Sequence, residues 1–189
     1  LGEKNILITF HPVTLEKSTS EVQFQALLDS ISELSNTKII FTKANSDTDG
    51  RVINSMIDGY VARHDNTIAF KSMGQLNYLS ALKFMDAVVG NSSSGLIEAP
   101  SFKIGTIDIG DRQKGRIKAN SIISCSPNKE SLDSALVKLY SREFQDIANN
   151  VVNPYGKGGA SKKVLKVIKD TSLENIVKKS FYDLQCVSY

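Results

Sequence analysis

The alternation of short apolar runs with amphipathic helical segments constrains this chain more than any other feature. Six runs have the length and composition of buried strands, at residues 5–10, 38–41, 67–70, 87–89, 106–109 and 122–125. Apolar residues recur at helical spacing near residues 22–34, 50–62, 76–85, 95–101, 129–140 and 160–169. Strands that alternate with helices form a parallel sheet covered by helices on both faces. The sequence therefore predicts a three-layer, Rossmann-like α/β fold.

The length and composition fit one globular domain. The chain has 189 residues, of which 41% are hydrophobic and 23% charged, which excludes a disordered protein. We expect residues 1–170 to form the domain and residues 171–189 to form a C-terminal helix and tail. The chain begins with Leu1 rather than methionine, so we expect it to be part of a longer protein.

Several classes of protein are disfavoured by composition. No apolar run approaches the roughly 18–20 residues of a membrane span, and no signal peptide opens the chain. Cys125 and Cys186 are too few for a disulfide framework and too isolated for a metal site. We therefore predict a cytoplasmic protein with no membrane partner, no metal and no cofactor.

The polar segments that follow the strands are the places to look for a binding site. In parallel α/β sheets, ligands bind beyond the carboxyl ends of the strands. These segments are also the most polar and glycine-rich parts of the chain, at residues 11–16, 42–49, 71–74, 90–95 and 110–118.

A serine-rich turn, GNSSSG at residues 90–95, lies between a strand and a helix. Its small residues, hydroxyls and helix N-terminus suit a phosphate or diphosphate. The alternative is an ordinary serine N-cap, and the turn matches neither the Walker pattern nor G-x-G-x-x-G, so both interpretations stay open. Glu98 follows in the same helix. It either complements the helix dipole or accepts hydrogen bonds from sugar hydroxyls.

A basic loop at residues 110–116 and a histidine add further candidates. Arg112 offers a planar guanidinium that pairs with phosphate oxygens, the alternative being a solvated loop. His11 directly follows the first strand, where an imidazole suits proton transfer or phosphate contact, although a lone histidine is more often structural. We expect the serine turn and the basic loop to share one edge of the sheet.

Taken together, these segments resemble the hydrolysing UDP-N-acetylglucosamine 2-epimerases of sialic acid biosynthesis. The matching stretches are TFHPVTLE (9–16), KANSDTDGR (43–51), GNSSSGLIEAPSFKIGTIDIGDRQKGR (90–116) and YGKGGASKK (155–163). Family members consist of two Rossmann-type domains that face a cleft, the GT-B arrangement, and this sequence resembles only the second domain. The resemblance implies that the N-terminal domain, with its acidic residues, is a missing partner and that the fragment is inactive alone.

The resemblance also implies a reaction and a role for each site residue. The reaction converts UDP-N-acetylglucosamine and water into N-acetylmannosamine and UDP. His11 is the implied catalytic residue, in phosphate contact or proton transfer. The implied nucleotide-binding residues are Ser92 and Ser93 at the diphosphate, Arg112 beside it, Glu98 at the ribose, Asn45 near the nucleotide, and Met73 and Tyr78 at the uracil.

Other functions stay open at this point. A GT-B glycosyltransferase that uses a UDP-sugar would share the fold. A nucleic-acid or regulatory module is disfavoured, because the net charge is only +3 and the basic tracts lack interleaved aromatic residues. We predict no nucleic-acid partner and expect the full-length enzyme to be a homo-oligomer. The resemblance leaves the sugar open between N-acetylglucosamine and a 2,4-diacetamido-trideoxy sugar.

Overall fold

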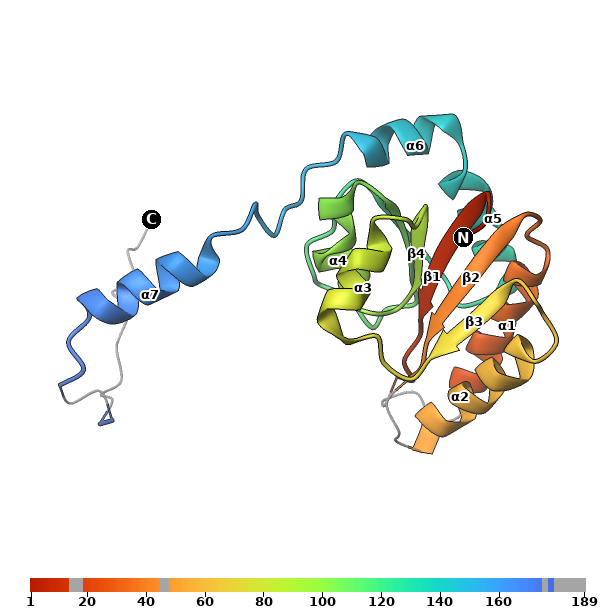
Figure 1. Ribbon diagram of the computed structural model, residues 1–189, viewed down its shortest axis with the longest axis horizontal. Coiled ribbons are helices and arrows are strands. Elements are labelled where there is room, and N and C mark those ends of the chain that lie inside the picture. The colour runs from red at the N-terminus through yellow and green to blue at the C-terminus, as the bar shows by residue number, and fades with distance from the viewer. Residues whose placement is uncertain (14–18, 45–47, 175–176, 179–189) are drawn as a thin grey trace, which may run out of the picture. The chain divides into compact units, whose positions relative to one another are not determined.

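Six parallel strands form one sheet in the computed structural model, which describes residues 1–13, 19–44, 48–174 and 177–178 (Figure 1). The strand order is β3-β2-β1-β4-β5-β6. The strands are β1 (Lys4–Thr9), β2 (Thr37–Thr42), β3 (Thr67–Phe70), β4 (Ala87–Gly90), β5 (Gly105–Ile109) and β6 (Ile122–Cys125). The parallel α/β fold is confirmed, because every predicted strand is present to within one residue at each end.

Helices connect the strands and follow the last of them. They are α1 (Ser20–Ser32), α2 (Thr48–Val61), α3 (Gly74–Leu82), α4 (Ser94–Ile97), the 3-10 helix η1 (Ala99–Phe102), α5 (Lys129–Leu139), α6 (Arg142–Asn149) and α7 (Ala160–Asp170). Helix α6 was not predicted from the sequence. Two features of the sequence indicate this helix. Ser141 is an N-cap whose hydroxyl accepts a hydrogen bond from the Phe144 N–H at 3.3 Å, and the buried residues Phe144 and Ala148 have helical spacing.

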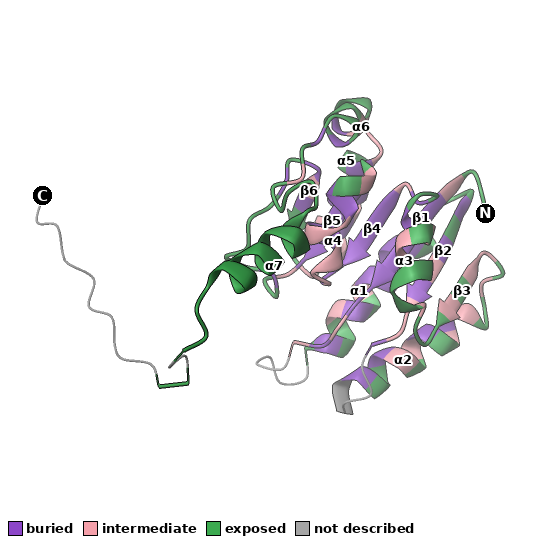
Figure 2. Cartoon of the chain, turned by 60° about the vertical axis from the view of Figure 1, so that its left-hand side comes forward, coloured by how far each residue is buried: buried purple, intermediate pink, exposed green. Residues whose placement is uncertain are grey.

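The central strands of the sheet are buried on both faces, as their apolar composition predicts. Ile6, Leu7 and Ile8 are consecutive in β1, and each is at most 1% exposed. One face packs against α1, α2 and α5, and the other against α3 and η1. Figure 2 shows the resulting layer of buried residues through the strands. Each fully buried aliphatic or aromatic side chain in this layer contributes about 1.5–3 kcal/mol to stability.

The order of the strands creates a switch point at β1. This strand pairs with β2 on one side and with β4 on the other. The chain therefore moves outward through β2 and β3 and then returns past β1 to β4. In such sheets the loops after the two strands at the switch diverge and leave a crevice at their carboxyl ends.

By its contacts the chain divides into two compact units, Leu1–Tyr155 and Gly156–Tyr189. The boundary predicted at residue 170 therefore lies inside the second unit, which contains α7. Gly156, Gly158 and Gly159 open this unit with positive φ angles, and no residue of α7 is buried. All residues discussed below belong to the first unit.

Candidate functional site

A pocket of about 470 Å³ lies at the carboxyl edge of the sheet. Residues that follow β1, β2, β3 and β4 contribute to its wall, so it lies at the switch point. The predicted site residues in this wall are His11, Met73, Tyr78, Ser92 and Glu98. The fold thus gathers residues from distant parts of the sequence at the edge where α/β sheets bind ligands.

His11 lies two residues beyond the end of β1, and the Asn91 side chain hydrogen-bonds to both its N–H and its carbonyl. Asn91 Oδ1 accepts a hydrogen bond from the His11 N–H at 2.8 Å, and Asn91 Nδ2 donates to the His11 carbonyl at 2.7 Å. The imidazole is half-buried in the pocket wall. A histidine in this place can contact an anion or exchange a proton with a ligand.

The serine turn leads from β4 into α4. Ser93 is the N-cap of α4 and its side chain makes no capping hydrogen bond, whereas Ser92 Oγ accepts a hydrogen bond from the Ser94 N–H at 3.4 Å. Ser92 and Ser94 both line the pocket, while Ser93 is not among the wall residues. Because α4 has only four residues, it aligns few peptide dipoles, and the dipole contribution is smaller than the sequence suggested. The N–H groups of Asn91, Ser94 and Gly95 already donate within the protein, so Ser92 and Ser93 are the candidate anion donors of the turn.

Tyr78 contacts the serine turn with its hydroxyl. Ser94 Oγ donates a hydrogen bond to the Tyr78 hydroxyl oxygen at 2.6 Å. Burial raises the pKa of Tyr78, and the nearby Glu98 carboxylate raises it further. The raised pKa keeps the phenol protonated at neutral pH, and its hydroxyl also has a hydrogen bond with Thr9. The hydroxyl end of Tyr78 therefore faces the serine turn.

Glu98 stands where α4 ends. It is the C-cap of α4, and its N–H donates to the Ser94 carbonyl at 2.9 Å. Glu98 is also the N-cap of η1, so an acid here opposes the dipole of α4 and complements that of the short 3-10 helix, and the dipole explanation stays open. The carboxylate is half-buried in the pocket wall, where it can accept hydrogen bonds from ligand hydroxyls.

The basic loop lies against the serine turn, so the two loops share one edge of the sheet as predicted. Arg112 Nη1 donates to the Asn91 carbonyl at 2.9 Å, and Gln113 Nε2 donates to the same oxygen at 2.7 Å. Gln113 is only 2% exposed. Arg112 is not in the wall of the pocket, and part of its hydrogen-bonding capacity is used on the turn. At the far end of the loop, Lys118 Nζ lies 2.7 Å from the buried Asp108 carboxylate.

The opposite side of the pocket comes from the segments after β2 and β3. Met73 is half-buried there, ahead of α3. Lys43 and Lys71 line the same wall and were missed by the sequence analysis, although each directly follows a strand. Lys43 Nζ hydrogen-bonds to Asp58 at 2.7 Å, so much of its charge is balanced. Asn45 lies outside the described residues.

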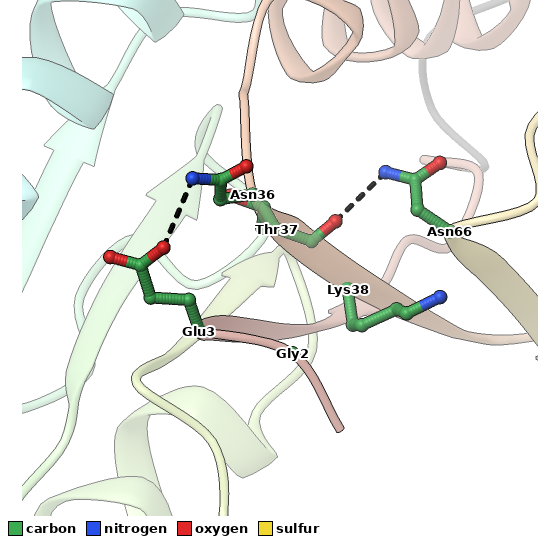
Figure 3. A pocket seen from close by; sticks show the side chains of 6 residues that line it. All are labelled: Gly2, Glu3, Asn36, Thr37, Lys38 and Asn66. Atoms are coloured by element: carbon green, nitrogen blue, oxygen red, sulfur yellow. Dashed lines mark hydrogen bonds between the residues drawn. The ribbon is translucent and has the colours of Figure 1, made fainter.

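A second pocket, of about 600 Å³, lies at the amino-terminal edge of β1 and β2 (Figure 3). Its polar side chains bond one another: Asn36 Nδ2 donates to Glu3 at 3.0 Å, and Asn66 Nδ2 donates to the Thr37 carbonyl at 2.8 Å. None of the predicted site residues lines it. Although this pocket is larger, the carboxyl-edge pocket is the better candidate because it has the switch-point position and the anion donors.

Among residues 1–13, 19–44, 48–174 and 177–178, no group of histidine, cysteine, aspartate and glutamate side chains is arranged to hold a metal ion. In the same part of the chain, none of the helices has both the length and the apolar character that crossing a bilayer requires.

Comparisons with known proteins identify a family and several relatives. A model of the family described as UDP-N-acetylglucosamine 2-epimerase matches residues 1–169. The GDP/UDP-N,N'-diacetylbacillosamine 2-epimerase (hydrolyzing) of Campylobacter jejuni is 40% identical over 97% of this chain and 48% of its own length. The polysialic acid biosynthesis protein P7 of Escherichia coli is 34% identical over 97% and 47%. The Staphylococcus aureus MnaA–UDP structure shares the fold, with a TM-score of 0.72 and 19% identity over 88% of this chain and 44% of that one.

The chain spans about half the length of the relatives it matches. The matched region includes the whole carboxyl-edge pocket and all eight of the residues that the sequence analysis singled out. The identity with the Campylobacter protein extends over nearly the entire chain. On these grounds the chain belongs to the UDP-N-acetylglucosamine 2-epimerase family.

Proposed function

We propose that this chain binds the UDP part of a UDP-sugar in the carboxyl-edge pocket. It would thereby serve as the nucleotide-binding half of a hydrolysing 2-epimerase. The observation that carries the proposal is the gathering of His11, Ser92 and Glu98 in one pocket at the switch point. The names of the relatives support it, since one is a hydrolyzing 2-epimerase and one solved structure contains UDP.

In the proposed reaction, UDP-N-acetylglucosamine and water give N-acetylmannosamine and UDP. Loss of the C2 proton and cleavage of the anomeric C–O bond expel UDP, and water then adds on the other face. Charge develops on the diphosphate as this bond breaks, so hydrogen-bond donors and cations around it stabilise the transition state. Ser92 and Ser93 are proposed to hold the diphosphate, and Arg112 to assist from the neighbouring loop.

The remaining residues are assigned to the other parts of the nucleotide and to proton transfer. Glu98 is proposed to accept hydrogen bonds from the ribose hydroxyls, and the segment at Met73 to contact uracil. Asn45 is proposed to lie near the nucleotide. Tyr78, which lies beside Ser94, is proposed to contact the ribose or phosphate in place of the uracil that the resemblance implied. His11 would contact the phosphate or transfer a proton, while acids of the absent half would act at the sugar. This chain alone is therefore expected to be inactive.

Calorimetric titration of UDP into the chain tests the proposal. We expect weak but saturable binding in the millimolar range or tighter, because half of the cleft is absent. Uridine and inorganic pyrophosphate are the controls, and each should bind more weakly than UDP since each lacks part of the recognised ligand. A folded chain that shows no heat of binding with millimolar UDP would contradict the proposal.

A second substrate is favoured by one observation. The Campylobacter relative, at 40% identity, is named for N,N'-diacetylbacillosamine rather than N-acetylglucosamine. The full-length enzyme should be assayed with both UDP-sugars, and the larger kcat/KM identifies the substrate. Release of the free 2-epimer without an acceptor sugar separates either epimerase from a GT-B glycosyltransferase. The cytoplasmic location and the homo-oligomeric state stay predictions, the latter to be measured by light scattering of the full-length enzyme.

A further inference from the structure

Asn91 connects three loops at the edge of the pocket. It directly follows β4 and is 1% exposed. Its side-chain amide bonds both the N–H and the carbonyl of His11, at 2.8 and 2.7 Å. Its own N–H donates to the Thr9 carbonyl at 3.2 Å. One buried amide therefore holds the loop after β1 against the loop after β4.

The carbonyl of Asn91 extends this connection to the basic loop. It accepts hydrogen bonds from Arg112 Nη1 and from Gln113 Nε2. Because Gln113 is buried, its bond to Asn91 is shielded from competition by water. All four polar atoms of Asn91 thus have partners, and they lie in the β1 strand and loop and in the basic loop.

The approach of β4 to β1 makes this arrangement possible. Gly90 pairs with Thr9 and has a φ angle of +140°, and a Cβ placed on it would lie 2.0 Å from the Thr9 carbonyl oxygen. Only glycine permits this backbone conformation at this separation. The chain can therefore turn at residue 90 and direct the Asn91 side chain back onto His11.

We propose that Asn91 is a positioning residue for the nucleotide site. It sets the direction in which His11 enters the pocket and holds Arg112 beside the serine turn before a ligand arrives. A site that is ordered in advance avoids the entropic cost of ordering its groups on binding. The inference rests on the proposed function, since the groups that Asn91 orders are those assigned to UDP.

The chain contains a matched control for this role. Asn5 makes the same two-way contact with Gly2: its Oδ1 accepts from the Gly2 N–H at 2.8 Å, and its Nδ2 donates to the Gly2 carbonyl at 3.2 Å. Asn5 is also buried, at 7% exposed, but it lies at the amino end of β1. Removing either amide breaks two hydrogen bonds, and only Asn91 borders the proposed nucleotide site.

The experiment compares Asn91→Leu with Asn5→Leu in the complete 189-residue chain. UDP affinity is measured by calorimetry, and amide hydrogen exchange of His11 by NMR. We expect Asn91→Leu to weaken UDP binding about tenfold and Asn5→Leu less than about twofold. The His11 amide should exchange at least about tenfold faster in Asn91→Leu and at the wild-type rate in Asn5→Leu. If Asn91→Leu does not fold, Asn91→Ala replaces it, since the smaller side chain leaves room for water beside His11.

The outcomes separate this inference from the proposed function. Equal UDP affinities of the two variants, with wild-type binding intact, would overturn the positioning role and leave the proposed function standing. An unchanged exchange rate of the His11 amide in the Asn91 variant would overturn it as well. If the wild-type chain binds no UDP, the proposed function fails, and the positioning role fails with it.

Discussion

Replacing Lys118 by methionine tests whether its ion pair with Asp108 stabilises the attachment of the basic loop to the sheet. Asp108 lies in β5 and is 1% exposed, and Lys118 Nζ lies 2.7 Å from its Oδ2. Within the described part of the chain, no N–H or O–H group donates a well-directed hydrogen bond to either carboxylate oxygen. The lysine at the end of the loop is therefore the main compensation for a buried negative charge.

The loss of stability expected in Lys118→Met depends on how far Lys118 and Asp108 are each buried. Breaking a fully buried ion pair costs about 3–5 kcal/mol, because the remaining charge is left without a partner. The Lys118 side chain is 30% exposed, so water reaches one side of the pair and reduces the cost. We expect Lys118→Met to lower the free energy of unfolding by about 2–3 kcal/mol. For a unit of this size, that corresponds to a fall in Tm of roughly 4–12 °C.

Urea unfolding at neutral pH, followed by circular dichroism, measures the effect. Lys114→Met is the matched control, because it makes the same charge change at an exposed position of the same loop and should cost less than about 0.5 kcal/mol. The double variant Asp108→Leu with Lys118→Met should regain most of the loss, since no buried charge remains. The reasoning is refuted if Lys118→Met and Lys114→Met are equally stable.

Three further experiments test the site, the approach of β4 to β1, and the surroundings of Cys125. Glu98→Gln should weaken UDP about tenfold or more while leaving pyrophosphate binding nearly unchanged, and equal losses by calorimetry would remove the ribose assignment. Gly90→Ala would bring a Cβ within 2.0 Å of the Thr9 carbonyl, so β1 and β4 must separate. We expect a loss of at least about 3 kcal/mol in urea unfolding, and wild-type stability would contradict the close approach. Burial raises the pKa of Cys125 to about 12, so little thiolate exists at pH 8. Its alkylation, followed by peptide mass spectrometry, should be about a thousandfold slower than that of an ordinary exposed thiol and should accelerate as the pH rises. Labelling at the rate of a free thiol would rule out this environment.

Several features could be predicted because the information for them is local. An apolar run such as residues 67–70 has the composition of a strand wherever it lies, and the helical spacing of Phe24, Leu27 and Ile31 marks one buried face. His11 and the serine turn could be selected as site candidates because each follows a predicted strand, and ligands bind at the carboxyl ends of parallel strands. The family resemblance rested likewise on contiguous stretches of sequence.

Other features depend on contacts that no local pattern contains. Asn91 and His11 are 80 residues apart, and Asn91 and Gln113 are 22 apart, so neither pairing has a sequence signal. The placing of Tyr78 beside Ser94 required the packing of α3 on the sheet. The shortness of α4, which turns into a 3-10 helix at Ala99, also changed the role expected of the helix dipole.

The sequence by itself determined which segments become strands and helices and which polar residues stand at their ends, because hydrophobic periodicity and turn chemistry act over a few neighbouring residues. Only the tertiary structure decided the order of the strands, and hence that β1 lies beside β4. That order brings the loops after residues 9 and 90 into one crevice. The pocket and the buried amide that organises it exist only because the packing of both faces of the sheet holds these distant segments together.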